Sequence, residues 1–375
     1  MRGEYLSLHH PSRHGEHVLL AMSGGVDSGV SALALAEAGY HVVGLTMKNY
    51  CYGDAGAPER SCCSLEAIDD ARAVCQRAGI RHMVVSTEEI FGREVYHNFL
   101  DEYRAGRTPN PCVRCNSIVR FQTLVEWAEK LGFDKVATGH YARVFRSGAG
   151  RLYVARSTSH AKDQSYFLSA LEPSVLNRVL FPLGDREKTE VREDARRAGL
   201  AVADKPDSQD VCFIATRTLR DFLDGKVPMH EGEIVTTTGD VVGHHDGVAT
   251  YTVGQRRGLG VAAGRPQYVI SVDAARNVVV VGDEPDLMKR ELVFRIAWVD
   301  HQAAENAVAS ATLRAQIRSR HEAQLATRIS VGATHARLEF AEAQRAIAPG
   351  QTVALYDGDI VVGAGIIESA GLAAA

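Results

Sequence analysis

Short apolar runs alternate with segments of helical periodicity through the first 140 residues, and this alternation limits the fold more than any other feature. Parallel strands need a long crossover, usually a helix, so repeated strand–helix units predict a parallel sheet with helices on both faces. The predicted strands cover residues 17–22, 41–47, 81–87 and 135–140, and the predicted helices cover 28–38, 65–78, 88–105 and 116–131. We therefore expect an α/β fold with a doubly wound parallel sheet.

The pattern changes after His140, where the sequence predicts a β-hairpin, a helical region and then mainly strands. The hairpin covers residues 141–155, and helical periodicity extends over 164–200. Short strands with glycine turns begin near residue 230, and the longer strands beyond 288 have turns spaced as in a β-barrel. We predict a catalytic domain at residues 1–220, a small β-rich domain at 221–287 and a C-terminal β-barrel at 288–375.

The composition is that of an ordinary globular protein, because 45% of the residues are hydrophobic and 23% are charged. No run of about eighteen apolar residues occurs, so no membrane span is expected. Residues 1–16 lack the apolar stretch of a signal peptide and are predicted to form a short tail. These features predict a cytoplasmic protein, which we expect to be a monomer.

The charge balance argues against a broad nucleic-acid coat, because 42 basic residues stand against 46 acidic ones and the net charge is −4. A local patch remains compatible with a nucleic-acid substrate. Between residues 311 and 330, Glu322 is the only acid beside four arginines, Arg314, Arg318, Arg320 and Arg328. A solvated strand face and a phosphate-binding patch both fit this segment.

Seven cysteines are present, and none lies beyond Cys212. An odd number without an export signal does not describe a disulfide framework, so these thiols are metal ligands, catalytic groups or core residues. Any sulfur chemistry therefore belongs to the first half of the chain. We expect structural roles for Cys51, Cys62, Cys63 and Cys75, with Cys62 and Cys63 able to bind an adventitious metal.

The segment SGGVDS at residues 23–28 stands between a predicted buried strand and a helix. Its two glycines allow a tight turn with accessible N–H groups, and the helix adds its positive N-terminal end, so the loop suits phosphate. It is neither a Walker loop nor a dinucleotide fingerprint, because both spacings are missing. A plain strand-to-helix turn is the alternative. We expect an exposed loop with Asp27 and Ser28 accessible.

SGGVDS resembles the pyrophosphate loop of the N-type ATP pyrophosphatases, which include GMP synthetase, argininosuccinate synthetase and tRNA thiolation enzymes. These enzymes cleave ATP between the α and β phosphates and adenylate a carbonyl oxygen. The resemblance implies an adenine nucleotide α-hydrolase-like fold. Further motifs, in chain order, are MKN (47–49), TPNPCVRCN (108–116), ATGHY (137–141), KDQSY (162–166), SQDVCF (208–213) and YTVGQRRGL (251–259). Together they resemble the tRNA-specific 2-thiouridylase (MnmA/TrmU) family over residues 17–367.

This resemblance implies that C2 of the wobble uridine U34 is thiolated in tRNAs for Lys, Glu and Gln, with ATP and Mg²⁺. The implied ATP-binding residues are Ala21, Met22, Ser23, Gly24, Gly25, Val26, Asp27, Ser28, Met47 and Gly139. Asn110, Pro111 and Cys112 would face the target base. The implied tRNA contacts are His140, Lys162, Asp163, Gln164, Arg318, Ser319 and Gln351, and residues 220–287 would support the RNA. A structural role for His140 and a core role for Met47 are the alternatives.

The implied catalytic residues are Cys115 and Cys212. A cysteine desulfurase or sulfur-relay protein would load Cys212 as a persulfide. Cys115 would attack this persulfide, which releases the terminal sulfur and leaves a disulfide between Cys115 and Cys212. A free thiol is only slightly ionised near neutral pH, so the site should lower the thiol pKa. Arg114 and the positive end of a helix starting at Asn116 are the expected means.

Cys112 departs from one pattern within the family, in which an aspartate stands at this position. The substitution creates a CxxC, so a second mechanism stays open, with a [4Fe–4S] cluster held by Cys112, Cys115 and Cys212. We favour the persulfide–disulfide route, which needs only Cys115 and Cys212. A thioredoxin-like redox motif fits less well, because of the ATP loop. The rival functions are another N-type ATP pyrophosphatase, namely an amidating ligase, and an RNA-binding module without catalysis.

Overall fold

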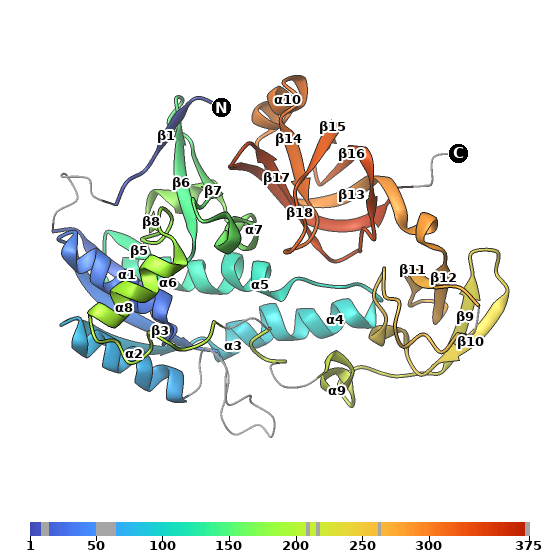
Figure 1. The fold of residues 1–375 in the computed structure, drawn as a ribbon, viewed down its shortest axis with the longest axis horizontal. Coiled ribbons are helices and arrows are strands. Elements are labelled where there is room, and N and C mark those ends of the chain that lie inside the picture. Colours follow the sequence, from blue (N-terminus) through green and yellow to red (C-terminus); the bar gives the residue numbers. More distant parts are fainter. Residues whose placement is uncertain (9–14, 50–64, 208–210, 215–217, 262–263, 372–375) are drawn as a thin grey trace. The chain divides into compact units, whose positions relative to one another are not determined.

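The computed structural model of the chain describes residues 1–8, 15–49, 65–207, 211–214, 218–261 and 264–371 (Figure 1). The chain divides into two compact units. Unit 1 comprises residues 1–95, 112–216 and 359–361, and unit 2 comprises 96–111, 217–358 and 362–375. Within the described ranges, no helix is long and apolar enough to cross a membrane.

Unit 1 contains a parallel sheet of five strands in the order β4-β3-β2-β5-β8. These strands are β4 (Arg81–Ser86), β3 (His41–Lys48), β2 (His17–Ala21), β5 (Lys135–Ala137) and β8 (Val179–Leu180). Along β2, Val18 and Leu20 point to one face of the sheet and Leu19 to the other, and all three are fully buried. Burial on both faces is typical of a parallel sheet between helices, and the α/β prediction is confirmed.

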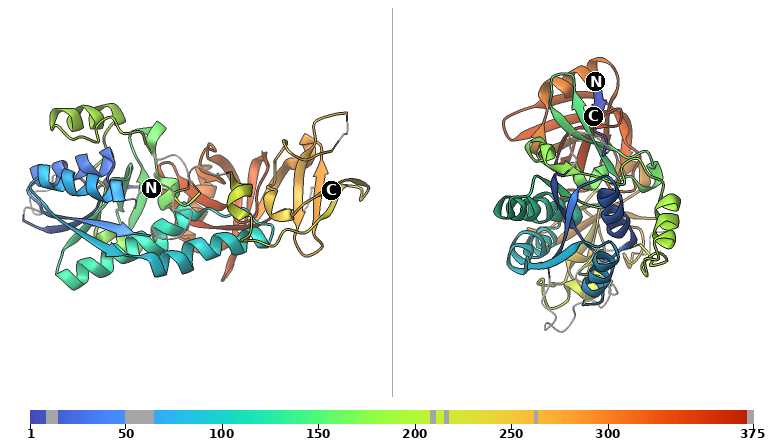
Figure 2. Two further views of the ribbon diagram at one scale, coloured as in Figure 1. Left: turned by 90° about the horizontal axis from the view of Figure 1, so that it is seen from below. Right: turned by 90° about the vertical axis from the view of Figure 1, so that its left-hand side faces the viewer.

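Helices cover both faces of this sheet (Figure 2). They are α1 (Val26–Glu37), α2 (Leu65–Arg77), α8 (Lys188–Arg197) and α6 (Phe121–Leu131). Helices α1, α2 and α8 contribute Val30, Val74 and Val191 to one hydrophobic cluster that also contains Leu20 of β2. Helix α6 contacts β2 and β5 from the opposite face. Burial of each such aliphatic side chain contributes roughly 1.5–3 kcal/mol.

Two long helical runs contain π-helical segments. The first consists of α3 (Glu88–Phe91), η2 (Gly92–His97) and α4 (Asn98–Arg104), and the second of α5 (Pro111–Arg114), η3 (Cys115–Arg120) and α6. The prediction that a helix starts at Asn116 is wrong, because this run already begins at Pro111. Proline suits a first helical position, since its φ is already helical and the N–H that it lacks has no intrahelical partner there.

The predicted hairpin at residues 141–155 is present, formed by β6 and β7. The strands in this part of unit 1 are β1 (Gly3–Tyr5), β6 (Ala142–Ser147), β7 (Leu152–Arg156) and the start of β18 (Ile360–Ala370). Strand β1 pairs with β6, so the predicted N-terminal tail contains a strand. On the other side of the hairpin, Ile360 pairs with Ala155 of β7.

The region predicted as helical over residues 164–200 is only partly helical. After η4 (His160–Lys162) it contains α7 (Ser165–Leu168), η5 (Pro173–Asn177), β8 and α8. The prediction missed β8, because a strand of two residues shows no period of two in the sequence. Val179 and Leu180 form a strand because they pair with Val136 and Ala137 of β5.

Unit 2 contains a four-stranded sheet and a barrel. The elements around the first sheet, which has the order β10-β9-β12-β11, are α9 (Leu219–Leu223), β9 (Gly232–Thr236), β10 (Val241–His245), η6 (Val248–Thr250), β11 (Tyr268–Asp273) and β12 (Val278–Gly282). The barrel part contains η7 (Glu284–Leu287), β13 (Met288–Val299), α10 (His301–Ala309), β14 (Leu313–Gln316), β15 (Gln324–Val331), β16 (His335–Arg345), β17 (Thr352–Asp357) and β18. Its order is β18-β13-β16-β15-β14-β17, and pairing of β17 with β18 closes it. The predicted β-rich and barrel architecture is confirmed, while the two domain boundaries, near residues 220 and 287, stay predictions.

Candidate active site

The loop after β2 makes a turn that only glycine allows at its first position. Gly24 has φ +69°, and a Cβ there would lie 2.2 Å from the carbonyl oxygen of Ala67. Gly25 differs, because a Cβ would meet only the Ser23 Oγ at 3.5 Å. Gly25 is also the N-cap of α1, and no described side chain caps this helix. The first N–H groups of α1 are thus available to an anion.

Ser28 holds this turn together from the inside. Its Oγ donates to the Gly25 carbonyl oxygen at 3.0 Å, and the Ser23 N–H donates to the same Oγ at 3.3 Å. The side chain is buried, so the expectation that Ser28 is accessible is wrong. The reason is that residues 26–28 belong to α1, which packs on the sheet, rather than to the loop.

Asp27 is the acidic residue in the first turn of α1, and two groups from other segments contact its carboxylate. The Tyr141 hydroxyl donates to Oδ1 at 2.9 Å, and the Lys188 Nζ lies 2.7 and 2.8 Å from Oδ1 and Oδ2. Burial, together with the Asp27 charge, raises the pKa of Tyr141, so this phenol stays protonated. Lys188 is the first residue of α8, and its side chain is only 12% exposed.

The same lysine contacts a second carboxylate, that of Asp207. The Lys188 Nζ lies 2.8 Å from Asp207 Oδ1, and Lys162 and Arg192 also pair with Asp207, at 2.9 and 3.0 Å. Burial raises the pKa of Asp207, but the hydrogen bonds from Lys188 and Lys162 outweigh it and lower the pKa to about 2. Two carboxylates therefore face three cations beside the glycine-rich loop.

Gly139 lies directly against the start of α1. A Cβ on Gly139 would be 2.9 Å from the Asp27 carbonyl carbon and the Ser28 nitrogen. The structure thus brings together nine of the ten predicted ATP-binding residues, namely residues 21–28 and Gly139. Met47, at the end of β3, is 8% exposed and belongs to the buried residues of unit 1. Its contact with the adenine stays a prediction.

His140 is buried between aromatic and polar side chains. Its Nδ1 lies 2.8 Å from the Thr138 Oγ1, and its Nε2 lies 3.3 Å from the Arg120 Nη1. Burial and the Arg120 charge lower the pKa of His140 to about 3, so the ring is neutral. Because the guanidinium can only donate, Nε2 accepts and the proton is assigned to Nδ1. A role in positioning the 138–140 segment follows from these contacts, and a direct tRNA contact stays a prediction.

Residues 162–164 differ in their environment. The Asp163 side chain is only 6% exposed, with Arg156 at 2.8 Å and hydrogen bonds from the Ser157 N–H and the Ser165 hydroxyl. Gln164 accepts from the Tyr141 N–H at 2.9 Å. The Lys162 side chain is 39% exposed and pairs with Asp207. Asp163 and Gln164 therefore shape the segment around Tyr141, and tRNA contacts at all three positions stay predictions.

The four described cysteines are thiols rather than disulfides. Cys75 is fully buried in the core of unit 1, and burial raises its pKa to about 11, as a structural thiol requires. Cys112, Cys115 and Cys212 are half-buried. Cys51, Cys62 and Cys63 lie outside the described residues, as do residues 208–210 of the SQDVCF motif.

Burial, reinforced by the neighbouring Cys115 thiol, raises the pKa of Cys112 to about 11, and the Arg120 charge opposes this rise. Arg114 is bound to Glu94 on the neighbouring helical run, through Nη2 to Oε2 at 2.8 Å and through Nε to the carbonyl oxygen. Because the helix begins at Pro111, Cys115 lies inside it and Cys112 in its first turn. We expected the positive end of a helix next to Cys115. In the structure that end lies at Pro111 instead.

The segments of both catalytic candidates attach to the run α3–η2. Arg114, next to Cys115, binds Glu94, and Phe213, next to Cys212, packs edge-on against Phe91 with ring centroids 5.9 Å apart. Phe91 and Glu94 are one helical turn apart, so the two segments meet the same part of this run. Cys115 is also the first residue of the π-helical segment η3, a kind of distortion that is frequent at functional sites.

The described residues contain no group of three or more His, Cys, Asp or Glu side chains that could hold a metal ion. Cys112, Cys115 and Cys212 thus do not form the three-thiol set that a [4Fe–4S] cluster would need. Mg²⁺ has a different requirement, since it usually keeps water ligands and takes one or two carboxylates beside substrate phosphates. Asp27 is the carboxylate at the loop, and Mg²⁺ bound there together with a nucleotide stays a prediction.

In unit 2 the structure connects two of the predicted tRNA-contacting segments. The Gln351 Nε2 donates to the carbonyl oxygens of Thr108 and Pro109 at 2.9 and 3.4 Å, so this amide holds the segment that leads to Asn110 and Pro111. Arg318 and Ser319 follow β14, and the Arg318 Nη1 donates to the Arg345 carbonyl oxygen at 3.0 Å. Direct contacts of these residues with tRNA stay predictions.

Sequence reasoning missed Tyr141 and Lys188, which contact Asp27, and also Asp207 and Arg192, which are joined to them through Lys188. Lys188 follows Asp27 by 161 residues, and nothing in its local pattern marks it. Tyr141 is the last residue of the ATGHY motif and was available as a candidate.

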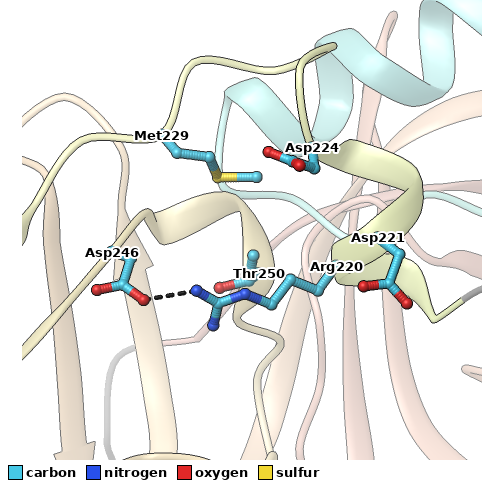
Figure 3. Close-up of a pocket in the computed structure, with 6 residues that line it drawn as sticks. All are labelled: Arg220, Asp221, Asp224, Met229, Asp246 and Thr250. Carbon is cyan, nitrogen blue, oxygen red and sulfur yellow. Dashed lines mark hydrogen bonds and ion pairs between the residues drawn. The ribbon is translucent and has the colours of Figure 1, made fainter.

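A cavity of about 270 Å³ in unit 2 is lined by Arg220, Asp221, Asp224, Met229, Asp246 and Thr250 (Figure 3). Arg220 reaches across it to Asp246 at 2.5 Å. None of the predicted site residues lines this cavity, so the candidate site is the loop and thiol region of unit 1.

Comparison with known proteins covers nearly the whole chain. Residues 16–216 match the tRNA methyl transferase HUP domain family, residues 220–283 the tRNA methyl transferase PRC-barrel domain family, and residues 290–367 the aminomethyltransferase beta-barrel domain family. Among solved structures, NMN synthetase from Francisella tularensis covers 57% of this chain and 74% of its own length, at 16% identity and a TM-score of 0.34. No functional argument follows from so low a score.

Three curated relatives carry the name tRNA-specific 2-thiouridylase MnmA. The protein from Geobacter metallireducens is 45% identical over 95% of this chain and 97% of its own length. Those from Koribacter versatilis and Clostridioides difficile are 43% and 42% identical, over 94% of this chain and 99% and 98% of their own lengths. The chain belongs to the family of tRNA-specific 2-thiouridylases.

Proposed function

We propose that this protein uses ATP to replace the C2 oxygen of the wobble uridine U34 by sulfur in tRNAs for Lys, Glu and Gln. The observation that carries the proposal is the combination, within unit 1, of an uncapped glycine-rich loop with two half-buried cysteines whose segments dock on one helical run. The names of the relatives supply the substrate class. We assign both chemical steps to residues 1–220 and support of the tRNA to residues 221–287 and 288–375.

In the first step the loop and the N-terminal end of α1 would bind the ATP phosphates. O2 of uridine attacks the α phosphorus, the bond between the α and β phosphates breaks, and pyrophosphate leaves. This step is needed because a carbonyl oxygen is a poor leaving group until AMP is attached to it. Lys188 balances the Asp27 charge, which would otherwise repel the phosphates. Mg²⁺ bound with the nucleotide would screen the remaining phosphate charge.

In the second step Cys212 carries a persulfide supplied by a cysteine desulfurase or a sulfur-relay protein. The terminal sulfur attacks C2, and the C2–O bond to AMP breaks. The Cys115 thiolate then attacks the Cys212 Sγ, so the S–S bond of the persulfide breaks and the transferred sulfur stays on C2 as the thiocarbonyl. The products are AMP, thiolated tRNA and a Cys115–Cys212 disulfide, which a two-electron thiol reductant must reopen before the next turnover.

Cys112 takes no part in these steps. A thiol with its pKa raised to about 11 is protonated at neutral pH, so it is a poor nucleophile there. The absence of a three-residue metal group among the described residues also favours the persulfide route over the [4Fe–4S] alternative.

Two measurements test the proposal. Pyrophosphate release should require tRNA, whereas an amidating ligase would release pyrophosphate with an amine or amino-acid substrate instead. Mass spectrometry of tRNA from a deletion strain should show loss of 2-thiouridine at U34. Wild-type levels of 2-thiouridine in that strain would contradict the proposal, and loss of a methylated nucleoside instead would point to the reaction in the domain family's name.

A further inference from the structure

We propose that Arg256 and Arg257 bind backbone phosphates of the tRNA on a surface of unit 2 that also contains Arg318 and Arg345. These two arginines belong to the YTVGQRRGL motif, to which the steps above give no role. The inference rests on the proposed function and adds to it the residues that hold the substrate RNA.

The loop that carries the arginine pair is held in one shape. The Gly254 N–H donates to the Val269 carbonyl oxygen at 2.8 Å, and the Val269 N–H donates back to Gln255 at 2.9 Å. Gly254 has φ +87°, which a side chain would oppose. Tyr251 and Leu259, at the two ends of the loop, are buried in the core of the four-stranded sheet. A loop anchored in this way loses little backbone conformational entropy when its side chains bind a ligand.

Arg256 and Arg257 are exposed and have no ion-pair partner in the part of the chain that the structure describes. Other exposed arginines of unit 2 are paired, for example Arg265 with Asp283 at 3.0 Å, Arg295 with Glu368 at 3.5 Å and Arg337 with Glu291 at 3.4 Å. Two adjacent guanidinium groups offer ten N–H donors in total and no acceptor, about five for each side chain. This chemistry fits the oxygens of successive phosphates.

The pair does not stand alone on the surface of unit 2. A Cβ on Gly254 would lie 2.7 Å from the Ala346 Cβ and 3.8 Å from the Arg345 Nη1. Arg318, an implied tRNA contact, donates to the Arg345 carbonyl oxygen at 3.0 Å. The arginine loop, Arg345 and Arg318 are therefore neighbours, and Glu284 at 3.1 Å from Arg345 is the acid paired within this group.

The same loop is tied to the segment that leads to the catalytic helix. The Thr252 Oγ1 lies 3.3 Å from the Thr108 Oγ1, and the Thr108 N–H donates to the Pro349 carbonyl oxygen at 2.8 Å. Thr108 precedes Cys115 by seven residues in the sequence. An RNA carries one negative charge at every nucleotide along its backbone. This periodic charge favours RNA over an acidic protein as the partner.

The test compares two double variants of the full chain, R256Q/R257Q and the matched control R295Q/R337Q, which removes the same charge from the barrel. Binding of unmodified transcribed tRNA is measured by fluorescence anisotropy over a series of KCl concentrations. Each lost phosphate contact reduces the slope of log K against log salt by about 0.7–0.9. The slope of R256Q/R257Q should therefore be smaller than that of the wild type by about 1.4–1.8. The control should keep the wild-type slope, and R256K/R257K should keep it too, because the charge is retained.

All variants should melt at the wild-type temperature, because the substituted side chains are exposed. If the double glutamine variant does not fold, the single variants R256Q and R257Q give the answer, since each should reduce the salt slope by about 0.7–0.9. A wild-type salt slope in R256Q/R257Q sinks the inference. If R256Q/R257Q binds tRNA like the wild type but is no longer loaded with sulfur, the surface serves the sulfur-donor protein. That result also overturns the inference. Wild-type protein that does not bind tRNA at all would instead remove the proposed function.

Discussion

Lys188 donates to both carboxylate oxygens of Asp27, at 2.7 and 2.8 Å, and thereby joins α8 to the first turn of α1. The same ammonium lies 2.8 Å from Asp207, so one cation compensates two carboxylates beside the loop that we assign to ATP. Without Lys188, the negative charge of Asp27 would stand at the helix end where phosphates are expected. The pair therefore makes the loop fit for an anion.

Replacing Lys188 by Met should lower pyrophosphate release by at least about 100-fold, because the uncompensated Asp27 would repel the phosphates. The control is Lys205→Met, which removes another lysine of unit 1 that pairs with two acids, Asp70 and Glu66. It should keep activity. If Lys188→Met unfolds, the double variant K188M/D207N restores the charge balance and should fold without regaining activity. Wild-type pyrophosphate release by a folded Lys188→Met protein would contradict the role of Lys188.

Gly24 and Gly25 should respond differently to alanine. Gly24→Ala should destabilise unit 1 by several kcal/mol, because its positive φ and the Ala67 carbonyl leave no room for a Cβ. Gly25→Ala meets no such obstacle, so the melting temperature should change little while the KM for ATP rises. Thermal melts and steady-state kinetics separate the two effects. Equal loss of stability in both variants would show that Gly25, too, has only a structural role.

The three half-buried cysteines should separate by function. Cys212→Ser should block sulfur transfer but allow tRNA-dependent pyrophosphate release, because adenylation and sulfur transfer use different groups. Cys115→Ser should behave similarly.

Cys112→Ser should retain activity within roughly twofold, since a thiol with a pKa of about 11 is almost fully protonated at neutral pH. Iron and sulfide analysis of anaerobically purified protein is the check. A stoichiometric cluster, lost together with activity in Cys112→Ser, would favour the cluster route.

His140 should stay neutral from pH 8 down to about pH 4, because burial lowers its pKa to about 3. The unfolded chain takes up a proton near pH 6.5 that the folded protein does not, so His140 reduces stability as the pH falls from about 6.5 towards 3. NMR titration tests this directly, with the His140 signal identified by its loss in His140→Asn. A midpoint near the ordinary histidine value of about 6.5 would show that the ring is accessible and charged.

A large part of the fold was predictable because it depends on patterns within short segments. The alternation of apolar runs and helical periodicity located four strands of the parallel sheet, and β8 was missed because two residues show no period. The predicted helix start was wrong because helical periodicity of the apolar residues is strong only after Asn116. The turn from Pro111 to Arg114 is also helical, but it has no such periodicity of its own. The SGGVDS loop was recognised because its turn chemistry is local.

The sequence by itself therefore determined the fold class, the glycine-rich loop and the identity of the cysteines, all of which are properties of residues close together in the chain. Only the tertiary structure decided that Lys188 meets Asp27 and that Gln351 holds Thr108, across 161 and 243 residues. It also decided that Ser28 is buried and that burial raises the pKa of Cys112. Contacts between distant segments and the desolvation that they cause leave no periodic trace in a sequence, because they depend on which surfaces meet when the chain folds.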